Sequence, residues 1–127
     1  MKNVSKILVL VLVLSLFTNV ALAEVEVNDY RVELMQKLVD RTNESILQDV
    51  ERAQENSEMI MEYLGDNFLS RFIVDAIIDS LVRTTNAKAD ATIRIGERLG
   101  ITVVCVYVEY FVGYRTVEID PLYVIAD

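Results

Sequence analysis

The chain has 127 residues, of which 12 are basic and 20 are acidic, so its formal charge is −8, and it contains no histidine. The absence of histidine removes the commonest general base and metal ligand, together with every nucleophile pair that depends on imidazole. The acidic balance disfavours nucleic acid, which proteins bind through Lys and Arg; one cysteine and four isolated glycines allow neither a two-cysteine zinc motif nor a glycine-rich phosphate loop.

Residues 1–23 have the features of an export signal. Lys2 and Lys6 form a basic start, residues 7–17 are almost entirely apolar, and the segment ends in Ala21-Leu22-Ala23. Small residues on either side of one variable position are the pattern that signal peptidase cuts. The sequence therefore predicts a signal peptide and a secreted or extracytoplasmic protein.

The remaining residues, 24–127, have the length of a single domain. Removal of two lysines with the signal would make this domain more acidic than the whole chain. The alternative is an uncleaved anchor, although the apolar stretch 7–23 is shorter than the about 20 residues that a membrane span requires. In that case the membrane would be contacted only through this segment.

Helical spacing dominates residues 28–99. Asn28 or Asp29 is expected to cap a first helix, in which apolar or small side chains recur every three or four residues. This stripe predicts a long helix with a narrow apolar face that packs on the rest of the domain. Its members are Met35, Val39, Thr42, Ile46, Val50, Ala53, Ser57, Ile60 and Leu64.

A break is predicted at residues 65–67, where Gly65 closes the first helix and Asp66 or Asn67 caps the next. The second helix, residues 68–85, is apolar on most sides, so we expect it to be central to a core or covered by a partner chain. Thr84-Thr85-Asn86 is a weaker break signal. Residues 87–99 after it are expected to form either a third helix or the continuation of the second.

Residues 101–125 are rich in Val, Ile and Tyr and predict two strands. The dipeptide Gly113-Tyr114 between them fits a two-residue type II′ turn, which requires glycine first. This turn pairs Val112 with Arg115 and extends one continuous antiparallel ladder away from the loop. Pro121 cannot donate to such a ladder, so its strand should be an edge or end there.

The register predicts an apolar face that packs on the helices and a second face that remains open. A hairpin alone is marginally stable in water, so we expect association with a second protomer or another protein, through strand addition at an edge or through a face. The predicted association surface consists of Val106, Val108, Tyr110, Val117 and Ile119 on one face and Tyr107 and Phe111 on the other.

Cys105 is the only cysteine and lies in an apolar stretch of the first strand. We expect it to be a small buried side chain, because apolar burial suppresses thiol reactivity. An intermolecular disulfide is the alternative in an oxidising compartment.

Three carboxylates form the best candidate for chemistry. Glu109 and Glu118 should lie directly opposite each other, with Asp120 nearby, and carboxylate oxygens are ligands for a calcium-type cation. The alternative interpretation is a solvated polar part of the hairpin. A hydrolase would need two such acids about 5 to 9.5 Å apart in a cleft.

The layout of the chain resembles a group of small exported helix-plus-hairpin proteins of Gram-positive anaerobic bacteria. The features that carry the resemblance are the export-type segment, acidic helices, a Val-rich strand, a glycine turn and a final strand that contains Glu118-Ile119-Asp120-Pro121-Leu122. The resemblance implies an exported helix-plus-hairpin domain and carries no activity, cofactor or site residue.

Together these patterns predict an α+β domain in which two or three N-terminal helices precede a C-terminal antiparallel β-hairpin packed on them. We expect a protein that is not an enzyme, needs no cofactor, and acts by association with itself or with an envelope or extracellular protein. A cation- or small-ligand-binding module that uses the hairpin carboxylates is the alternative.

Overall fold

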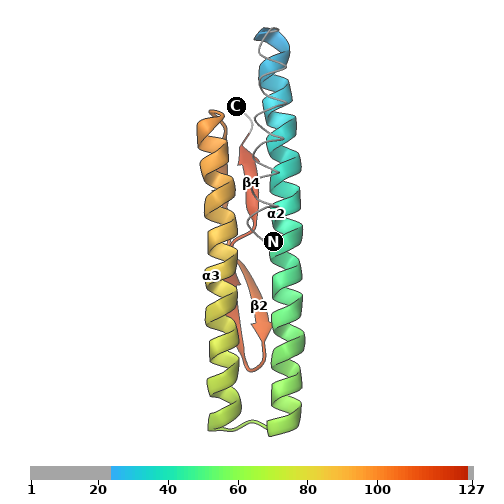
Figure 1. Cartoon of the computed structure of the whole chain (residues 1–127), viewed down its shortest axis with the longest axis vertical. Coiled ribbons are helices and arrows are strands. Elements are labelled where there is room, and N and C mark those ends of the chain that lie inside the picture. Colours follow the sequence, from blue (N-terminus) through green and yellow to red (C-terminus); the bar gives the residue numbers. More distant parts are fainter. Residues whose placement is uncertain (1–23, 126–127) are drawn as a thin grey trace, which may run out of the picture.

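The computed structural model describes residues 24–125, so the predicted signal segment lies outside the described residues. Two helices, α2 (Glu24–Leu64) and α3 (Phe68–Arg98), precede the strands β1 (Thr102–Cys105), β2 (Val108–Val112), β3 (Arg115–Ile119) and β4 (Leu122–Ile125). The helices run antiparallel, and the strands form a narrow ribbon along one side of the pair (Figure 1). This arrangement confirms the predicted α+β layout.

The apolar stripe of α2 is confirmed, whereas the predicted start of the helix is wrong. Met35, Val39 and Val50 are fully buried, and only the last member of the stripe, Leu64, is exposed. The helix is already formed at Glu24 and so runs through the predicted caps at positions 28 and 29. Polar cap residues are only mildly unfavourable inside a helix, and no glycine or proline here forces a break.

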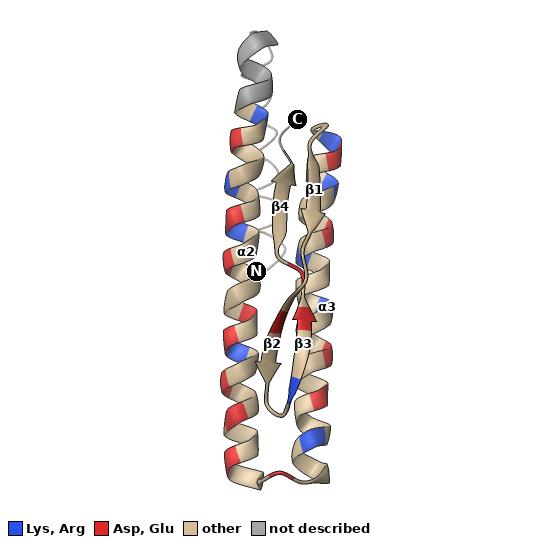
Figure 2. Ribbon diagram, turned by 180° about the vertical axis from the view of Figure 1, so that it is seen from behind, with Lys and Arg blue, Asp and Glu red and all other residues tan. Residues whose placement is uncertain are grey.

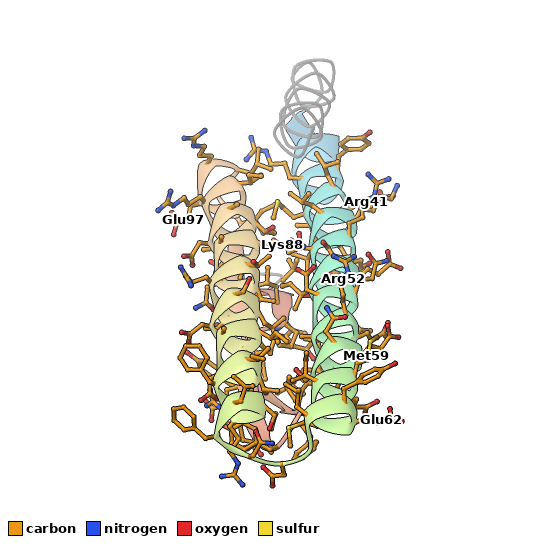
Figure 3. The ribbon with its side chains drawn as sticks, turned by 60° about the horizontal axis from the view of Figure 1, so that its bottom comes forward. Arg41, Arg52, Met59, Glu62, Lys88 and Glu97 are labelled. Atoms are coloured by element: carbon orange, nitrogen blue, oxygen red, sulfur yellow. The ribbon has the colours of Figure 1, made fainter. Side chains whose placement is uncertain are left out.

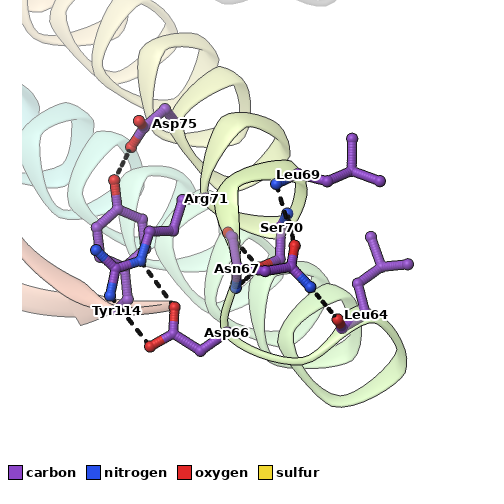
Figure 4. A network of polar contacts seen from close by, with 8 residues as sticks. All are labelled: Leu64, Asp66, Asn67, Leu69, Ser70, Arg71, Asp75 and Tyr114. Atoms are coloured by element: carbon purple, nitrogen blue, oxygen red, sulfur yellow. Dashed lines mark hydrogen bonds and ion pairs between the residues drawn. The ribbon is translucent and has the colours of Figure 1, made fainter.

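The predicted break at residues 65–67 is confirmed. Gly65 adopts a φ of 72° after α2, which glycine tolerates best. The Asn67 side chain then accepts hydrogen bonds from the backbone N–H groups of Leu69 and Ser70, each at 3.1 Å. The Ser70 hydroxyl accepts from the Asn67 N–H at 3.0 Å, which completes a capping box at the start of α3 (Figure 4).

Thr84-Thr85-Asn86, the weaker of the two break signals in the helical region, does not interrupt the helix. Helix α3 continues through it to Arg98, so residues 87–98 belong to α3 and not to a third helix, and Leu99 is the C-cap. Thr85 is buried, and its hydroxyl donates to the Leu81 carbonyl at 2.9 Å. A threonine that returns its hydroxyl to its own helix is compatible with a helix interior.

The ribbon has the predicted register throughout. Val112 pairs with Arg115 beside the turn, and the same alignment holds to the pair Thr102 and Ile125. Gly113 adopts the expected positive φ, 67°, and the Tyr114 N–H donates to the Val112 carbonyl at 2.8 Å. The ladder is not continuous, however, because the strands form two separate sheets, β1 with β4 and β2 with β3.

The ribbon makes a half turn between these two sheets. Strands β4 and β2 pack against α2, and β1 and β3 pack against α3, so the two chains of the ribbon exchange sides (Figure 2). At the crossing, one backbone bond remains, from the Val106 N–H to the Pro121 carbonyl at 2.9 Å. Two-stranded ribbons twist strongly, and Pro121 lacks the N–H that would return a second bond here.

The half turn corrects the prediction of one apolar face along the whole hairpin. In the β2–β3 sheet, Val112, Val117 and Ile119 are buried against the helices, in accord with the prediction. In the β1–β4 sheet the opposite face is turned inward, and Val103 and Leu122 are the buried residues. The register is unchanged, and only the face presented to the helices alternates.

Two apolar clusters result, one on each side of the crossing. The turn-side cluster consists of Ile46, Val50, Ala53, Val74, Ile78, Leu81, Val112, Val117 and Ile119. The terminal cluster consists of Met35, Val39, Ala89, Leu99, Ile101, Val103 and Leu122.

A polar layer joins the helices between the two clusters. The hydroxyl groups of Thr42 and Thr92 lie 2.7 Å apart. Lys88 donates to Ser45 at 2.7 Å and forms an ion pair with Asp49. These bonds satisfy the polar groups that the helix contact would otherwise bury without partners.

Candidate interaction surface

The face of the ribbon that points away from the helices carries large apolar side chains. The side chains of Tyr107, Phe111 and Tyr123 are 67%, 60% and 54% exposed. Val106 and Ile125 are also exposed. Figure 2 shows the ribbon in front of both helices, with no other described element over it. We call the surface formed by Val106, Tyr107, Phe111, Tyr123 and Ile125 the open face.

The structure divides the predicted association residues into two groups. Tyr107, Phe111 and Val106 are exposed on the open face, whereas Val108 is 37% exposed on the side of the ribbon that faces the helices, opposite the buried Ile119. Tyr110 is half-buried, and the other two residues of the predicted set, Val117 and Ile119, belong to the turn-side cluster. The chain's own helices therefore cover Val117 and Ile119, which act as anchors of the ribbon and not as exposed contacts.

The predicted carboxylate site is only partly assembled. Glu109 and Glu118 are directly opposite each other, as expected, and both are exposed. Over residues 24–125, no group of three or more acidic or cysteine side chains is close enough to hold a metal ion. The pair therefore lies on open surface, and the structure does not bring Asp120 to it as a third ligand.

Asp120 has a distinct environment at the ribbon crossing. Its Oδ1 atom is buried without a hydrogen-bond partner. Burial raises the pKa of this carboxyl, and the nearby charges of Glu118 and Asp90 raise it further. The neutral, protonated form is thus favoured in the fold relative to a solvated aspartate.

Cys105 is half-buried on β1 and packs against the terminal cluster. Burial raises the pKa of its thiol, and the charges of Asp120 and Asp90 act in the same direction. A raised pKa lowers the thiolate fraction and hence the reactivity. Cys105 therefore packs as an apolar side chain, but it is half-buried and not fully buried as predicted.

Helix α2 covers the ribbon edge that lies beside it. The Asn43 side-chain amide accepts a hydrogen bond from the Leu122 N–H at 2.8 Å and donates one to the Leu122 carbonyl at 2.9 Å. Gln54 donates to the Phe111 carbonyl at 3.0 Å. Two amide side chains therefore satisfy outward backbone groups of β4 and β2, as a further strand would. The sequence shows only a weak signal for this role: two amides beside the apolar stripe of α2.

A second set of exposed apolar side chains surrounds the helix-to-helix turn. Tyr63 is 81% and Phe68 is 85% exposed, and Met59, Leu64, Leu69 and Phe72 are exposed as well. Met59 points away from α3 on the outer side of α2 (Figure 3), and Leu64 and Leu69 project together beside the turn (Figure 4). One prediction placed the second helix at the centre of a core. The exposed side chains of Phe68, Leu69 and Phe72 show that the start of α3 is not surrounded by core.

A polar network fixes the hairpin tip to this end of α3. Arg71 pairs with Asp66 at 2.7 Å and lies 4.9 Å from the ring centre of Tyr114. The Tyr114 hydroxyl donates to Asp75, which also pairs with Arg115 at 3.3 Å. The hydrogen bond to Asp75 raises the pKa of Tyr114, and the hydrogen bond from Arg71 lowers that of Asp66. The tip of the ribbon is therefore held in place.

No helix in the part of the chain from 24 to 125 is both long and apolar enough to span a bilayer. Comparisons with protein-family models, characterised proteins and solved structures find no significant match. The interpretation of the surface therefore depends on its own residues.

Proposed function

We propose that this chain is an exported, non-catalytic protein that acts by association, either with itself or with a protein at or outside the cell envelope. The observation that carries the proposal is the open face, where Tyr107, Phe111 and Tyr123 are each more than half exposed. Tyrosine and phenylalanine are enriched at protein interfaces, and here they lie on one face of a ribbon, with the exposed pair Glu109 and Glu118 between Tyr107 and Phe111.

The surroundings of this face favour binding over catalysis. The backbone beneath it is fixed by the buried residues Val112, Val117 and Ile119, so a partner would meet a surface that is already ordered and would lose little entropy on binding. The exposed pair Glu109 and Glu118 lies on strand surface, whereas a carboxylate hydrolase places its two acids in a cleft.

The molar mass of the purified chain in solution, measured by light scattering over a range of concentrations, tests self-association. We expect a mass above that of one chain, which falls when Tyr107→Ser and Phe111→Ser are combined. The matched control combines Phe68→Ser and Phe72→Ser, which removes two exposed aromatic rings at the helix turn and should leave the mass unchanged. A strict monomer at all concentrations would contradict self-association.

Export is tested separately. In a secreting bacterial host, we expect the protein outside the cytoplasm with Glu24 as its first residue, because signal peptidase would cut after Ala23. Mass spectrometry of the recovered protein gives this N-terminus. An intact chain that sediments with membranes would instead support the uncleaved anchor.

A further inference from the structure

The exposed apolar side chains of the two helices are concentrated at the end that carries the helix-to-helix turn. Among residues 30–98, the only large apolar side chain exposed elsewhere is Leu47, at 44%. Single exposed apolar residues are normal on a soluble protein, whereas a cluster of them marks a contact surface. We call this cluster the helix-turn patch; its members are Met59, Tyr63, Leu64, Phe68, Leu69 and Phe72.

The helix-turn patch surrounds the end of the helix pair and does not form one flat face. Met59 points away from α3 on the outer side of α2 (Figure 3), and Tyr63 follows it one helical turn later. Phe68 and Phe72 lie two residues before and two residues after the fully buried Ser70, so both are on the side of α3 that faces away from the core. The two pairs therefore point outward from opposite flanks of the helix pair.

Leu64 and Leu69 cover the end between these flanks. Figure 4 shows both side chains on one side of the turn, with the ion pair of Asp66 and Arg71 on the side toward the hairpin tip. The capping box at Asn67 and this ion pair hold the turn in place. The apolar side chains are therefore presented by an ordered, convex end of the molecule.

This geometry favours a lipid surface over a protein partner. A folded protein meets a convex end from one direction and covers one flank, whereas the interfacial region of a bilayer is fluid and contacts both flanks and the end together. The patch occupies the last two turns of α2 and the first turns of α3. Two turns are roughly 10 Å of helix, and interfacial helices bury their apolar face about 5 to 10 Å into the boundary between headgroups and acyl chains.

Charge selects the kind of lipid and disfavours a second copy of the chain. The only base in residues 58–72 is Arg71, which is paired with Asp66. The exposed carboxylates of Glu58 and Glu62 therefore leave this end negative. Two copies joined end to end would bring these like charges together, and an anionic lipid surface would repel them as well. A zwitterionic surface has no net charge and avoids both costs.

We infer that the helix-turn patch inserts into the surface of a zwitterionic phospholipid bilayer, with Phe68 and Phe72 among the acyl chains and the polar residues of the turn among the headgroups. The sequence predicted membrane contact only through residues 1–23, which precede Glu24 at the opposite end of α2 (Figure 1). The inference does not depend on association through the open face, because the two surfaces share no residue.

Cosedimentation with phosphatidylcholine vesicles tests the inference, with protein prepared from Glu24 onward. Both apolar clusters and the ribbon lie after this residue, and an apolar leader would itself bind lipid. We expect the wild type to bind, and Phe68→Ser combined with Phe72→Ser to weaken binding at least tenfold. The matched control, Tyr107→Ser with Phe111→Ser, removes two exposed rings from the open face and should leave binding unchanged. Protein concentrations below those that raise the light-scattering mass keep self-association out of the measurement.

A fluorescence reporter gives a second test that keeps the patch apolar. The chain has no tryptophan, so Phe68→Trp introduces a single indole into the patch. We expect its emission to shift to shorter wavelength when vesicles are added, and to be quenched by lipids brominated in their acyl chains. Phe111→Trp, on the open face, should show neither change.

The outcomes that would overturn the inference are specific. They are a wild type that does not bind phosphatidylcholine vesicles, binding that survives both serine substitutions, and equal responses of the two tryptophan reporters. Binding that requires anionic lipid and disappears in salt would also overturn it, because the contact would then be electrostatic. Phe68 and Phe72 are exposed, so we expect thermal unfolding of their serine variant to match the wild type, which separates a loss of binding from a loss of fold.

Discussion

The turn-side and terminal clusters are formed by the same two helices and the same ribbon, but they use opposite faces of that ribbon. The turn-side cluster combines Ile78 and Leu81 of α3 with the β2–β3 sheet. In the terminal cluster α3 contributes small residues, Ala89 and the buried Gly96, and β1 approaches closely. The comparison shows that a hairpin can keep its register and still reverse the face that it buries.

The largest effect should come from cavities placed on either side of the crossing. Ile119 and Leu122 are each 1% exposed, and they belong to different clusters. We expect Ile119→Ala and Leu122→Ala each to lower the free energy of unfolding by about 3 to 4 kcal/mol, as for other buried aliphatic residues. Urea denaturation followed by circular dichroism measures both values.

The same experiment shows whether the clusters unfold together. Because α2 and α3 run through both clusters without interruption, we expect one transition with an unchanged dependence on urea in each variant. Two separated transitions in either variant would show that the polar layer divides the molecule into independent units.

A smaller loss is expected where the ribbon tip enters between the helices. A Cβ atom at Gly113 would lie 2.6 Å from Val74 Cγ1 and 3.2 Å from Ser57 Cβ. We expect Gly113→Ala to cost about 3 kcal/mol, from this overlap together with the positive φ. Gly100→Ala is the control, since Gly100 has a φ of 72° with nothing within 4 Å, and should cost about 1 kcal/mol. Equal losses would show that the tip is not tightly packed.

Substitutions in the polar layer that separates the clusters should lower the stability less than the cavities or the change at Gly113. The side chains of Lys88 and Asp49 are 25% and 15% exposed. Lys88→Met leaves the Asp49 carboxylate without its cation, and we expect a loss of about 2 kcal/mol in chemical denaturation, within the range for a hydrogen bond to a charged group. Addition of Asp49→Leu should restore much of the loss, because well-packed apolar residues can replace an ion pair. A double variant as unstable as the single one would contradict this.

The smallest expected effect on stability comes from substitution of Asp120, which lies at the crossing of the ribbon. Because burial raises the pKa of this carboxyl in the fold, its contribution to stability is complete at pH values below the pKa of the unfolded chain and is lost as the pH rises through the raised value. At pH 7 the ionised group therefore opposes folding. We expect Asp120→Asn to be more stable than the wild type in thermal unfolding at pH 7.

This advantage should disappear on acidification to below pH 3.8, the ordinary pKa of an aspartate, because the wild-type carboxyl is then protonated in both states. A gain of the same size at every pH would show that the asparagine acts through a new hydrogen bond and not through the lost charge.

Local patterns in the sequence predict much of this fold. The stripe from Met35 to Ser57, the break at Gly65 and the pairing of Val112 with Arg115 all follow from spacing or turn chemistry, and the structure confirms them. The continuity of α3 through Thr85 remained open, because a threonine inside a helix and one at a junction have the same local sequence.

The candidate surface was less accessible to prediction. The exposure of Tyr107 and Phe111 followed from strand alternation. Alternation could not place Val117 and Ile119, because the sequence shows that one face is apolar but not whether helices or a partner cover it. The side-chain amides of Asn43 and Gln54 form hydrogen bonds to residues that are 79 and 57 positions away along the chain. No local sequence pattern encodes contacts of this range.

The sequence alone therefore determined the helix stripe, the capped turn and the strand register, because each depends on residues that are neighbours along the chain or across a tight turn. Only the tertiary structure decided the half turn of the ribbon, the division of the core by a polar layer, and the hydrogen bonds from α2 side chains to one edge of the ribbon. These features depend on how the twist of two strands fits the spacing of two packed helices, and that fit exists only after the chain has folded.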